Sequence, residues 1–158
     1  MGRHFDIGYF RKKTKIRSKI ASKRTIVNKI KAWALDKEYY DGQRINGYGG
    51  FKYDGRWKVL LPKIINRYRL TKKSRVLDLG SKKSFLLKDL NILIPGIKSF
   101  GIENHSYPLK KAVKSKSKLI LSEYYNIPFK DKYFDFLIAF NSVYMQNLGD
   151  VIKTLKEI

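Results

Sequence analysis

The second half of the chain alternates short apolar segments with helical ones, and this alternation limits the possible folds more than any other feature of the sequence. Four strands are predicted, at residues 74–79, 98–102, 118–121 and 134–140. Helices are predicted at residues 85–90 and 106–115, and from about residue 150 onward. Nearly all-apolar strands that alternate with helices indicate a parallel sheet covered on both faces, with right-handed connections. The predicted fold class is therefore α/β.

The first 37 residues form a basic segment with a periodic apolar pattern. Val27, Ile30 and Leu35 recur at near-helical spacing, which predicts an amphipathic helix from about Ser22 to Asp36. A helix of this kind more often covers a core with its apolar face. The alternative is that it lies on RNA or lipid.

Residues 41–57, DGQRINGYGGFKYDGRW, are dense in glycine and aromatic residues and too irregular for a helix or a long strand. We predict an ordered loop. Its glycines allow the backbone to turn or to approach a ligand closely, and its aromatic side chains can either anchor the loop to the core or stack on a ligand. A helix is predicted to follow at residues 58–69, with Pro62 in its first turns.

Length and composition exclude several classes of protein. With 158 residues, 43% of them hydrophobic, the chain can form one domain with a core but not two. It has no cysteine and only two histidines, His4 and His105, so we expect no disulfide, cysteine nucleophile or metal site. No apolar run reaches the roughly 20 residues that span a bilayer. Because the N-terminus also lacks the apolar stretch of a signal peptide, we expect a cytoplasmic location.

The formal net charge of +22 has two interpretations. Clustered lysine and arginine side chains attract nucleic acid or an anionic membrane surface. The chain is also rich in Ile, Asn, Tyr and Phe, which share with lysine codons poor in G and C, so a biased genome explains the same charge without any partner. A nucleic-acid-binding protein that uses the basic N-terminal segment is therefore the alternative function.

Polar residues stand at the ends of the four predicted strands. Residues 78–84 follow the first strand, Glu103 the second, Glu123 the third and Asn141 the fourth. In doubly wound folds the ligand lies outside the carboxyl ends of the strands. A carboxylate that closes the second strand is placed to accept both hydroxyls of a ribose. Together the four positions predict a site for an adenosine-containing ligand.

Three segments of the chain resemble a known family. They are VLDLGSKKSFLL, PGIKSFGIE and NIPFKDKYFDFLIAFNSVYMQNL. They resemble the first four conserved blocks of the class I S-adenosylmethionine-dependent methyltransferases, over about residues 74–148. The third segment is the most specific, because the family has an L-P-F-x-D-x-x-F-D pattern before its fourth strand. The segment YYDGQRINGYGGFKYDGRW resembles the lead-in of a bacterial subgroup, where it is expected to pack over the cofactor site.

The resemblance implies a Rossmann-like sheet, S-adenosylmethionine (SAM) as the cofactor, and roles for individual residues. Asp78 and Gly80 correspond to the acidic and first glycine positions of the cofactor loop. Glu103 corresponds to the acid that binds the ribose, and Glu123 to the acid near the adenine amino group. The predicted cofactor-binding residues are Asp78, Leu79, Gly80, Ser81, Glu103, Asn104, Glu123, Tyr124 and Asn141.

The same resemblance implies transfer of a methyl group to an unidentified acceptor. The sulfonium of the cofactor is already a good leaving group, so the protein has to align the acceptor with the methyl carbon and exclude water. Asn141 matches the residue beside the transferring methyl. Asn141 and Tyr48 are the candidate catalytic residues for this alignment and shielding.

The cofactor loop departs from the family pattern at Lys82 and Ser84, where the second and third glycines are usual. Those glycines let the backbone approach the methionyl part of the cofactor or turn with positive φ. A lysine there crowds that space or forces strain of ~1 to 3 kcal/mol. Its ammonium can pair with the cofactor's carboxylate, yet it also lies near the positive sulfonium. Impaired cofactor binding is therefore a hypothesis.

The family fold has seven strands, whereas this sequence supplies four, in the expected order 3-2-1-4. We expect a basic extension and lead-in at residues 1–57, a partial methyltransferase domain at residues 58–158, and a chain that is a fragment or a truncated product. The free edge of the fourth strand is expected to favour association.

Overall fold

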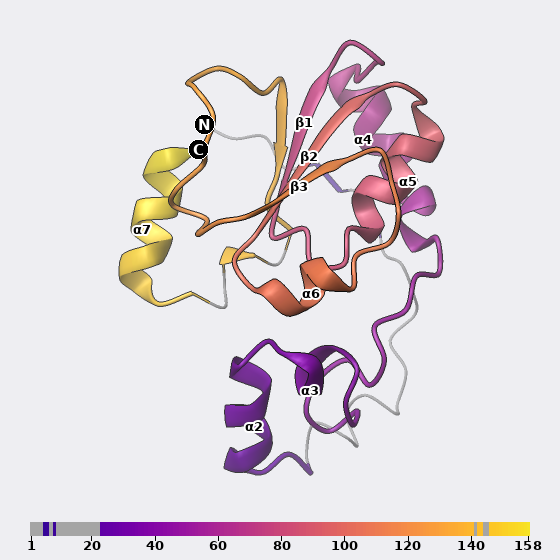
Figure 1. Ribbon diagram of the computed structural model, residues 1–158. Coiled ribbons are helices and arrows are strands. Elements are labelled where there is room, and N and C mark those ends of the chain that lie inside the picture. The colour runs from indigo at the N-terminus through magenta and orange to yellow at the C-terminus, as the bar shows by residue number, and fades with distance from the viewer. Residues whose placement is uncertain (1–4, 7, 9–22, 141, 144–145) are drawn as a thin grey trace.

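The computed structural model describes residues 5–6, 8, 23–140, 142–143 and 146–158. Its centre is a four-stranded sheet in which every pair of neighbouring strands is parallel. The strands are β1 (Arg75–Leu79), β2 (Lys98–Glu103), β3 (Lys118–Leu121) and β4 (Phe136–Ile138). Their order is β3-β2-β1-β4 (Figure 1). The predicted parallel α/β sheet and its strand order are both confirmed.

The register of the sheet brings the ends of the strands to one rim. Asp78, near the end of β1, lies opposite Gly101 of β2 and Ile138 of β4. Glu103, the last residue of β2, lies opposite Leu121, the last residue of β3. Residues that follow these strands are therefore neighbours in space although they are far apart in the sequence.

Two hydrophobic clusters form the core, and β1 contributes to both. Val76 belongs to one cluster and Leu77 to the other, because successive side chains of a strand point to opposite faces. The first cluster joins the sheet to α4 (Leu61–Tyr68) and α5 (Phe85–Leu93). The second contains the buried side chains Leu79, Ile102 and Tyr124. No helix in the described ranges is long and apolar enough to cross a membrane.

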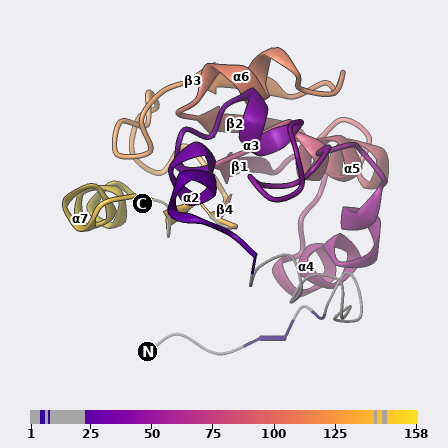
Figure 2. The ribbon, with the colours of Figure 1, turned by 90° about the horizontal axis from the view of Figure 1, so that it is seen from below.

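Two short helices, α2 (Ile26–Trp33) and α3 (Lys37–Tyr40), lie beyond the rim at which β1 and β2 end (Figures 1 and 2). Thr25 caps α2, because its hydroxyl accepts a hydrogen bond from the backbone of Asn28 while the Asn28 side chain accepts from the backbone of Thr25. The apolar side chains of α2 are exposed. The expectation that this helix covers a core is therefore wrong for α2.

Several predicted elements have different bounds in the structure, and the helix expected at about 22–36 is described only as α2. The helix expected at 106–115 is only α6 (Ser106–Lys110), because the chain then turns and the backbone N–H of Val113 donates to the carbonyl of Lys83. The helix expected at 58–69 is divided into a 3₁₀ turn, η1 (Arg56–Val59), and α4. The fourth strand is shorter than expected. The last helix, α7 (Leu148–Glu157), begins two residues early, at the cap formed by Asn147.

Candidate functional site

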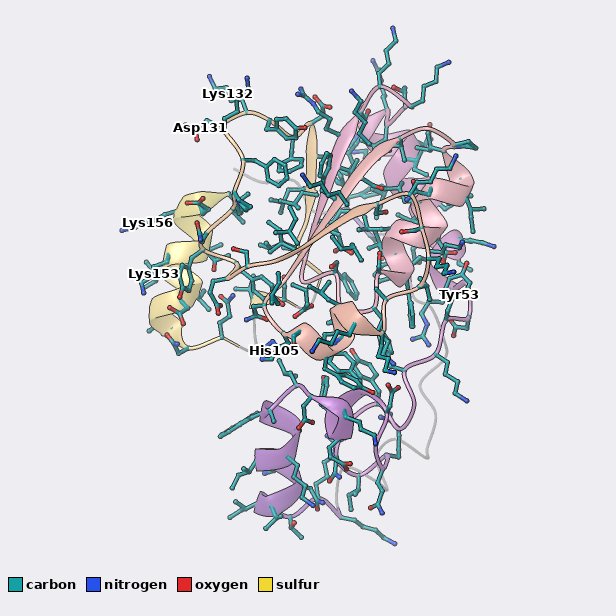
Figure 3. All side chains as sticks on the ribbon, viewed as in Figure 1. Tyr53, His105, Asp131, Lys132, Lys153 and Lys156 are labelled. Carbon is teal, nitrogen blue, oxygen red and sulfur yellow. The ribbon has the colours of Figure 1, made fainter. Side chains whose placement is uncertain are left out.

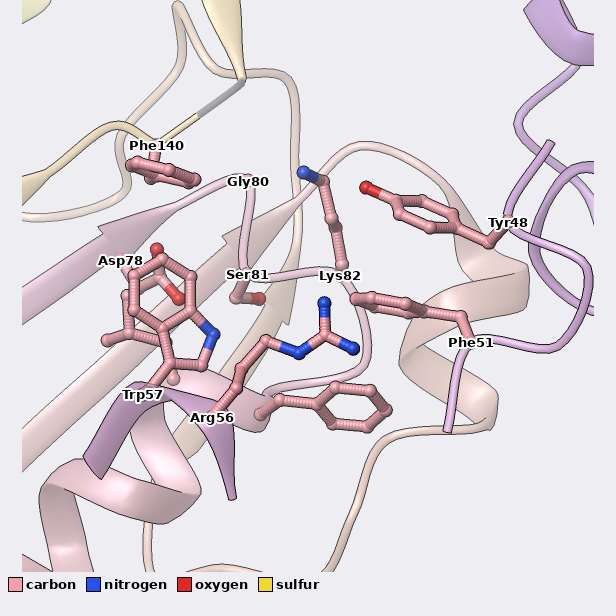
Figure 4. A pocket seen from close by; sticks show the side chains of 11 residues that line it. Tyr48, Phe51, Arg56, Trp57, Asp78, Gly80, Ser81, Lys82 and Phe140 are labelled. Carbon is pink, nitrogen blue, oxygen red and sulfur yellow. The ribbon is translucent and has the colours of Figure 1, made fainter. Parts of the chain in front are cut away.

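A cavity of about 270 Å³ lies at the carboxyl end of β1 (Figure 4). One wall is the end of β1 and the loop that follows it, residues 78–82. The opposite wall comes from the predicted loop at 41–57, which we call the lead-in, and contributes Tyr48, Phe51 and Trp57. The lead-in therefore lies over the end of the strand, where doubly wound folds place their ligands.

A second, smaller cavity of about 40 Å³ lies at the end of β2, beside Glu103, Asn104 and Tyr124. The side chain of Lys82 lines both cavities. A space of 40 Å³ holds about one water molecule. The two cavities thus meet at Lys82, and the second is too small for an adenosyl group while the side chains stay in place.

The carboxylate of Glu103 is 1% exposed and accepts hydrogen bonds from several donors of the chain. Its Oε2 accepts from the backbone N–H of Lys82 at 2.8 Å. Its Oε1 accepts from the Tyr124 hydroxyl at 3.0 Å and from the backbone N–H groups of Asn104 and His105 at 3.1 and 3.3 Å. Burial and the neighbouring Glu103 charge raise the pKa of Tyr124, so its hydroxyl keeps the proton that it donates.

Asp78 is 4% exposed and lines the larger cavity. Burial raises the pKa of this carboxyl to about 7, although the nearby charge of Lys82 acts in the opposite direction and Glu103 raises it further. The side chain therefore titrates near neutral pH. A carboxyl of this kind beside a cavity is a candidate for a functional group.

The raised pKa of Asp78 predicts a pH-dependent stability. The folded state binds the proton more tightly than the unfolded chain, so this contribution is complete below about pH 4 and is lost as the pH rises through about 7. We expect Asp78→Asn to remove the loss, and its free energy of unfolding relative to the unaltered chain to rise by on the order of 4 kcal/mol between pH 4 and pH 8. Urea unfolding of the variant and of the unaltered chain at both pH values measures this difference in the free energy of unfolding. A difference that does not change with pH would contradict the prediction.

The loop after β1 has an unusual backbone. Gly80, Lys82 and Ser84 all have positive φ, at 81°, 52° and 63°. Only glycine adopts such angles without a steric penalty. At Gly80 a side chain is excluded as well, because a Cβ would lie 2.5 Å from the Cβ of Ser142. The two positions that depart from the family pattern are therefore strained, as the sequence hypothesis proposed.

Three buried hydroxyl groups lie in this loop or beside it. The Oγ atoms of Ser81, Ser84 and Ser142 have no hydrogen-bond partner among the residues that the structure describes. Ser81 lines the larger cavity and Ser142 the smaller one. Because buried polar groups are normally paired, hydroxyls left unpaired beside a cavity fit a site for a polar ligand.

An ion pair joins the lead-in to the loop. The ammonium of Lys83, whose side chain is only 7% exposed, lies 2.6 and 2.7 Å from the two carboxylate oxygens of Asp41 and also donates to the carbonyl of Phe51. The hydroxyl of Tyr107 donates to the same carboxylate at 2.7 Å. Partial burial acts to raise the pKa of Asp41, but the hydrogen bonds and the charge of Lys83 outweigh it and keep this pKa below its ordinary value. We call this arrangement the Asp41 clamp.

Aromatic contacts and the buried carboxylate of Asp89 hold the rest of the lead-in in place. The ring of Phe51 stacks on Tyr48 at 4.3 Å and packs on Phe85 of α5 at 4.6 Å. The buried carboxylate of Asp89, in α5, accepts from the Tyr53 hydroxyl at 2.6 Å and from the backbone N–H of Trp57 at 3.1 Å. The loop is therefore anchored to the core, and three of its aromatic side chains also line the cavity, where stacking on a ligand stays a prediction.

The predicted site residues do not all meet at one place. Tyr48, Asp78, Gly80 and Ser81 line the larger cavity, and Glu103, Asn104 and Tyr124 the smaller one. Leu79 is part of the core. Glu123 is exposed, lines neither cavity and accepts from the Asn104 side chain at 3.5 Å. Asn141 lies outside the described residues.

The larger cavity is also lined by residues that sequence reasoning did not select as site residues, among them Arg56, Trp57 and Phe140. The guanidinium of Arg56 is held by the carboxylate of Asp54, with an N···O distance of 2.8 Å. The density of glycine and aromatic residues in the lead-in was the available signal for the first two. The described residues contain no group of three or more histidine, aspartate or glutamate side chains that could hold a metal ion.

Comparison with solved structures tests the fold independently. The plantazolicin methyltransferase BpumL, in complex with SAH, matches 91% of this chain with a TM-score of 0.54 and 21% identity, and the match covers 56% of BpumL. SAM-bound CalS10, an amino pentose methyltransferase from Micromonospora echinaspora, matches 65% of this chain with a TM-score of 0.53 and 18% identity, over 46% of its own length. The chain has the class I methyltransferase fold.

A methyltransferase from Clostridium acetobutylicum described as S-adenosylmethionine-dependent also matches, over 67% of this chain and 44% of its own, with a TM-score of 0.50 and 17% identity. The chain thus spans about half the length of these class I structures. No protein-family model matches the sequence, and no curated protein matches it. At these identities the likeness establishes the fold, and the activity requires separate argument.

Proposed function

We propose that this chain binds SAM at the carboxyl ends of β1 and β2 and acts in methyl transfer. The observation that carries the proposal is the buried carboxylate of Glu103 at the end of β2, fixed beside a loop whose backbone turns through three positive φ angles. A carboxylate at this point of a doubly wound sheet is the usual partner of ribose hydroxyls. The class I fold and the cofactors in the BpumL and CalS10 structures support the choice of ligand.

The residues of the chain fit the chemistry of this cofactor. Glu103 supplies an anionic acceptor for the ribose, and Ser81, whose buried hydroxyl has no partner among the described residues, lines the larger cavity, where we place the methionyl part. When bound, SAM supplies a methyl group on a sulfonium. The aromatic wall of Tyr48, Phe51 and Trp57 would exclude water and hold the acceptor in line. We retain Asn141 and Tyr48 as the candidates for alignment.

The fit requires one rearrangement. The cavity beside Glu103 is about 40 Å³, whereas sites for cofactors are usually several hundred Å³, so an adenosyl group enters only after a side chain moves. Lys82 lies at the junction of the two cavities, and Tyr124 occupies the Glu103 oxygen Oε1. These two side chains are therefore the ones that we expect the cofactor to displace. We propose methyl transfer to an unidentified acceptor. We also propose that residue 57 is the boundary between the basic extension with its lead-in and the partial methyltransferase domain.

Isothermal titration of the chain with SAM and with SAH tests the proposed function. We expect binding of both, and we expect Glu103→Gln to weaken it by about tenfold, because a hydrogen bond to a charged group is lost. Asp131→Asn, in an exposed loop at the far end of the sheet (Figure 3), is the matched control and should not change the affinity. Circular dichroism checks that both variants fold. If neither compound binds at millimolar concentration, the proposal fails.

A further inference from the structure

A helix that covers a core turns its apolar face inward and its polar face to solvent. Helix α2 does the reverse. Its inward contact is polar, because the side chain of Asn28 donates to the side chain of Asn46 at 2.9 Å. Its large apolar side chains are exposed to 57–73% of their full area. They are Ile26, Val27, Ile30 and Trp33. Figure 3 shows several side chains of α2 projecting away from the rest of the molecule.

The helical repeat places these side chains on one stripe with lysines at both edges. Successive residues of an α-helix are turned by about 100°, so Ile26, Ile30 and Trp33 fall within one narrow arc and Val27 stands beside it. By the same repeat Lys29 lies on one edge of the stripe and Lys31 on the other. The exposed surface of α2 is thus an apolar stripe with a tryptophan, bordered by cations.

The charged side chains of α2 itself have one sign, while the acidic residues nearest to it in the sequence, Asp36 and Glu38, belong to α3 and its N-cap. The helix, IVNKIKAW, contains no acidic residue, and Lys23 and Arg24 precede it. Helix α7 is a useful contrast. It also exposes apolar side chains, among them Ile152, but it carries Asp150 and Glu157 together with its lysines. Exposure of apolar residues therefore occurs on both helices, whereas the all-cationic border is a property of α2.

From this pattern we infer that α2 docks on an anionic lipid surface. An apolar stripe that enters the boundary between headgroups and acyl chains, a tryptophan at that boundary and lysines that reach the headgroups are the features of an interfacial helix. Each basic side chain near such a surface adds about 1 kcal/mol of attraction. A second copy of this chain is a poorer occupant, because it would bring lysines against lysines on molecules of charge +22. RNA would use the cations and leave the isoleucines exposed.

Vesicle binding followed by tryptophan fluorescence tests this inference without use of the cofactor site. With vesicles containing anionic phosphatidylglycerol we expect a blue shift of the emission and quenching by brominated acyl chains, and we expect neither with vesicles of phosphatidylcholine alone. Trp33→Phe should abolish both signals, since it leaves only Trp57, which lines the cavity. Ile30→Glu should weaken insertion by at least about tenfold, because a charge replaces a buried apolar side chain.

Ile152→Glu on α7 is the matched control and should insert like the unaltered chain. The inference is overturned if anionic vesicles bind the chain without quenching of Trp33, since adsorption by charge alone would explain that result. It is also overturned if Ile152→Glu weakens insertion as much as Ile30→Glu. A blue shift that grows with protein concentration in the absence of lipid would assign the stripe to self-association instead.

Discussion

Replacing both Lys82 and Ser84 by glycine is expected to tighten SAM binding by about ten- to a hundredfold, a gain of roughly 1.4 to 2.8 kcal/mol. Lys82 lies where the two cavities meet, so its side chain must leave before an adenosyl group can reach Glu103. A glycine at 82 removes that side chain, and glycines at both positions remove the steric cost of φ at 52° and 63°. Isothermal titration of the double variant and of the unaltered chain measures the change.

Lys132→Gly is the control for this experiment. Lys132 also has a positive φ, 57°, but it lies in an exposed loop far from the cavities (Figure 3). We expect that variant to gain stability, by up to about 1 kcal/mol, with no change in affinity. An equal gain in affinity for both variants would mean that the effect does not come from the cofactor loop, and would contradict the prediction. Unchanged affinity of the double variant would remove Lys82 as an obstacle.

Asp41→Asn is expected to lower the free energy of unfolding by about 3 kcal/mol, because it leaves the buried ammonium of Lys83 without its counter-charge. We also expect the lead-in to open, since the carboxylate of Asp41 accepts from Lys83 and Tyr107 together. Urea unfolding measures the first effect. Hydrogen exchange of the amide of Phe51, which donates to the same Asp41 side chain, measures the second.

Asp131→Asn again supplies the comparison, because Asp131 is an exposed carboxylate whose replacement should change stability by less than about 0.5 kcal/mol. The Asp41 variant should exchange its Phe51 amide faster even at urea concentrations where it remains folded. Equal stabilities of the two variants, or an unchanged exchange rate in the folded state, would show that the clamp does not hold the lead-in.

Strand β1 was predictable because its burial on both faces requires an apolar run, and β3, whose residues are half-buried or exposed, was predictable from its apolar residues alone. KLIL at 118–121 has the bounds that the sequence suggested, and the carboxylate of Glu103 stands at the strand end where it was expected. The loop after β1 was predictable in a different way. The missing glycines at Lys82 and Ser84 identified two positions of positive φ, because the conformation is set by the sheet and the helix on either side and not by the residue.

What escaped prediction depends on contacts between distant parts of the chain. The ion pair of Asp41 with Lys83 joins residues 42 positions apart, and no local pattern records such a partner. Arg56 reaches the cavity only because Gly55, with φ at 67°, turns the chain into η1. The apolar repeat selected Val27 and Ile30 of the α2 stripe but also counted Leu35, which lies beyond the end of the helix. Periodicity also does not say whether a stripe faces protein or solvent.

The Asp41 clamp has a consequence for how this site can evolve. Lys83 directly follows the loop that forms one wall of the cavity, and Asp41 belongs to the segment that forms the other, so their ion pair joins the two walls. If the lead-in were replaced by that of another protein without an acidic residue at this position, the buried ammonium of Lys83 would lose its counter-charge. The lead-in and the loop should therefore be inherited, and engineered, as one cassette.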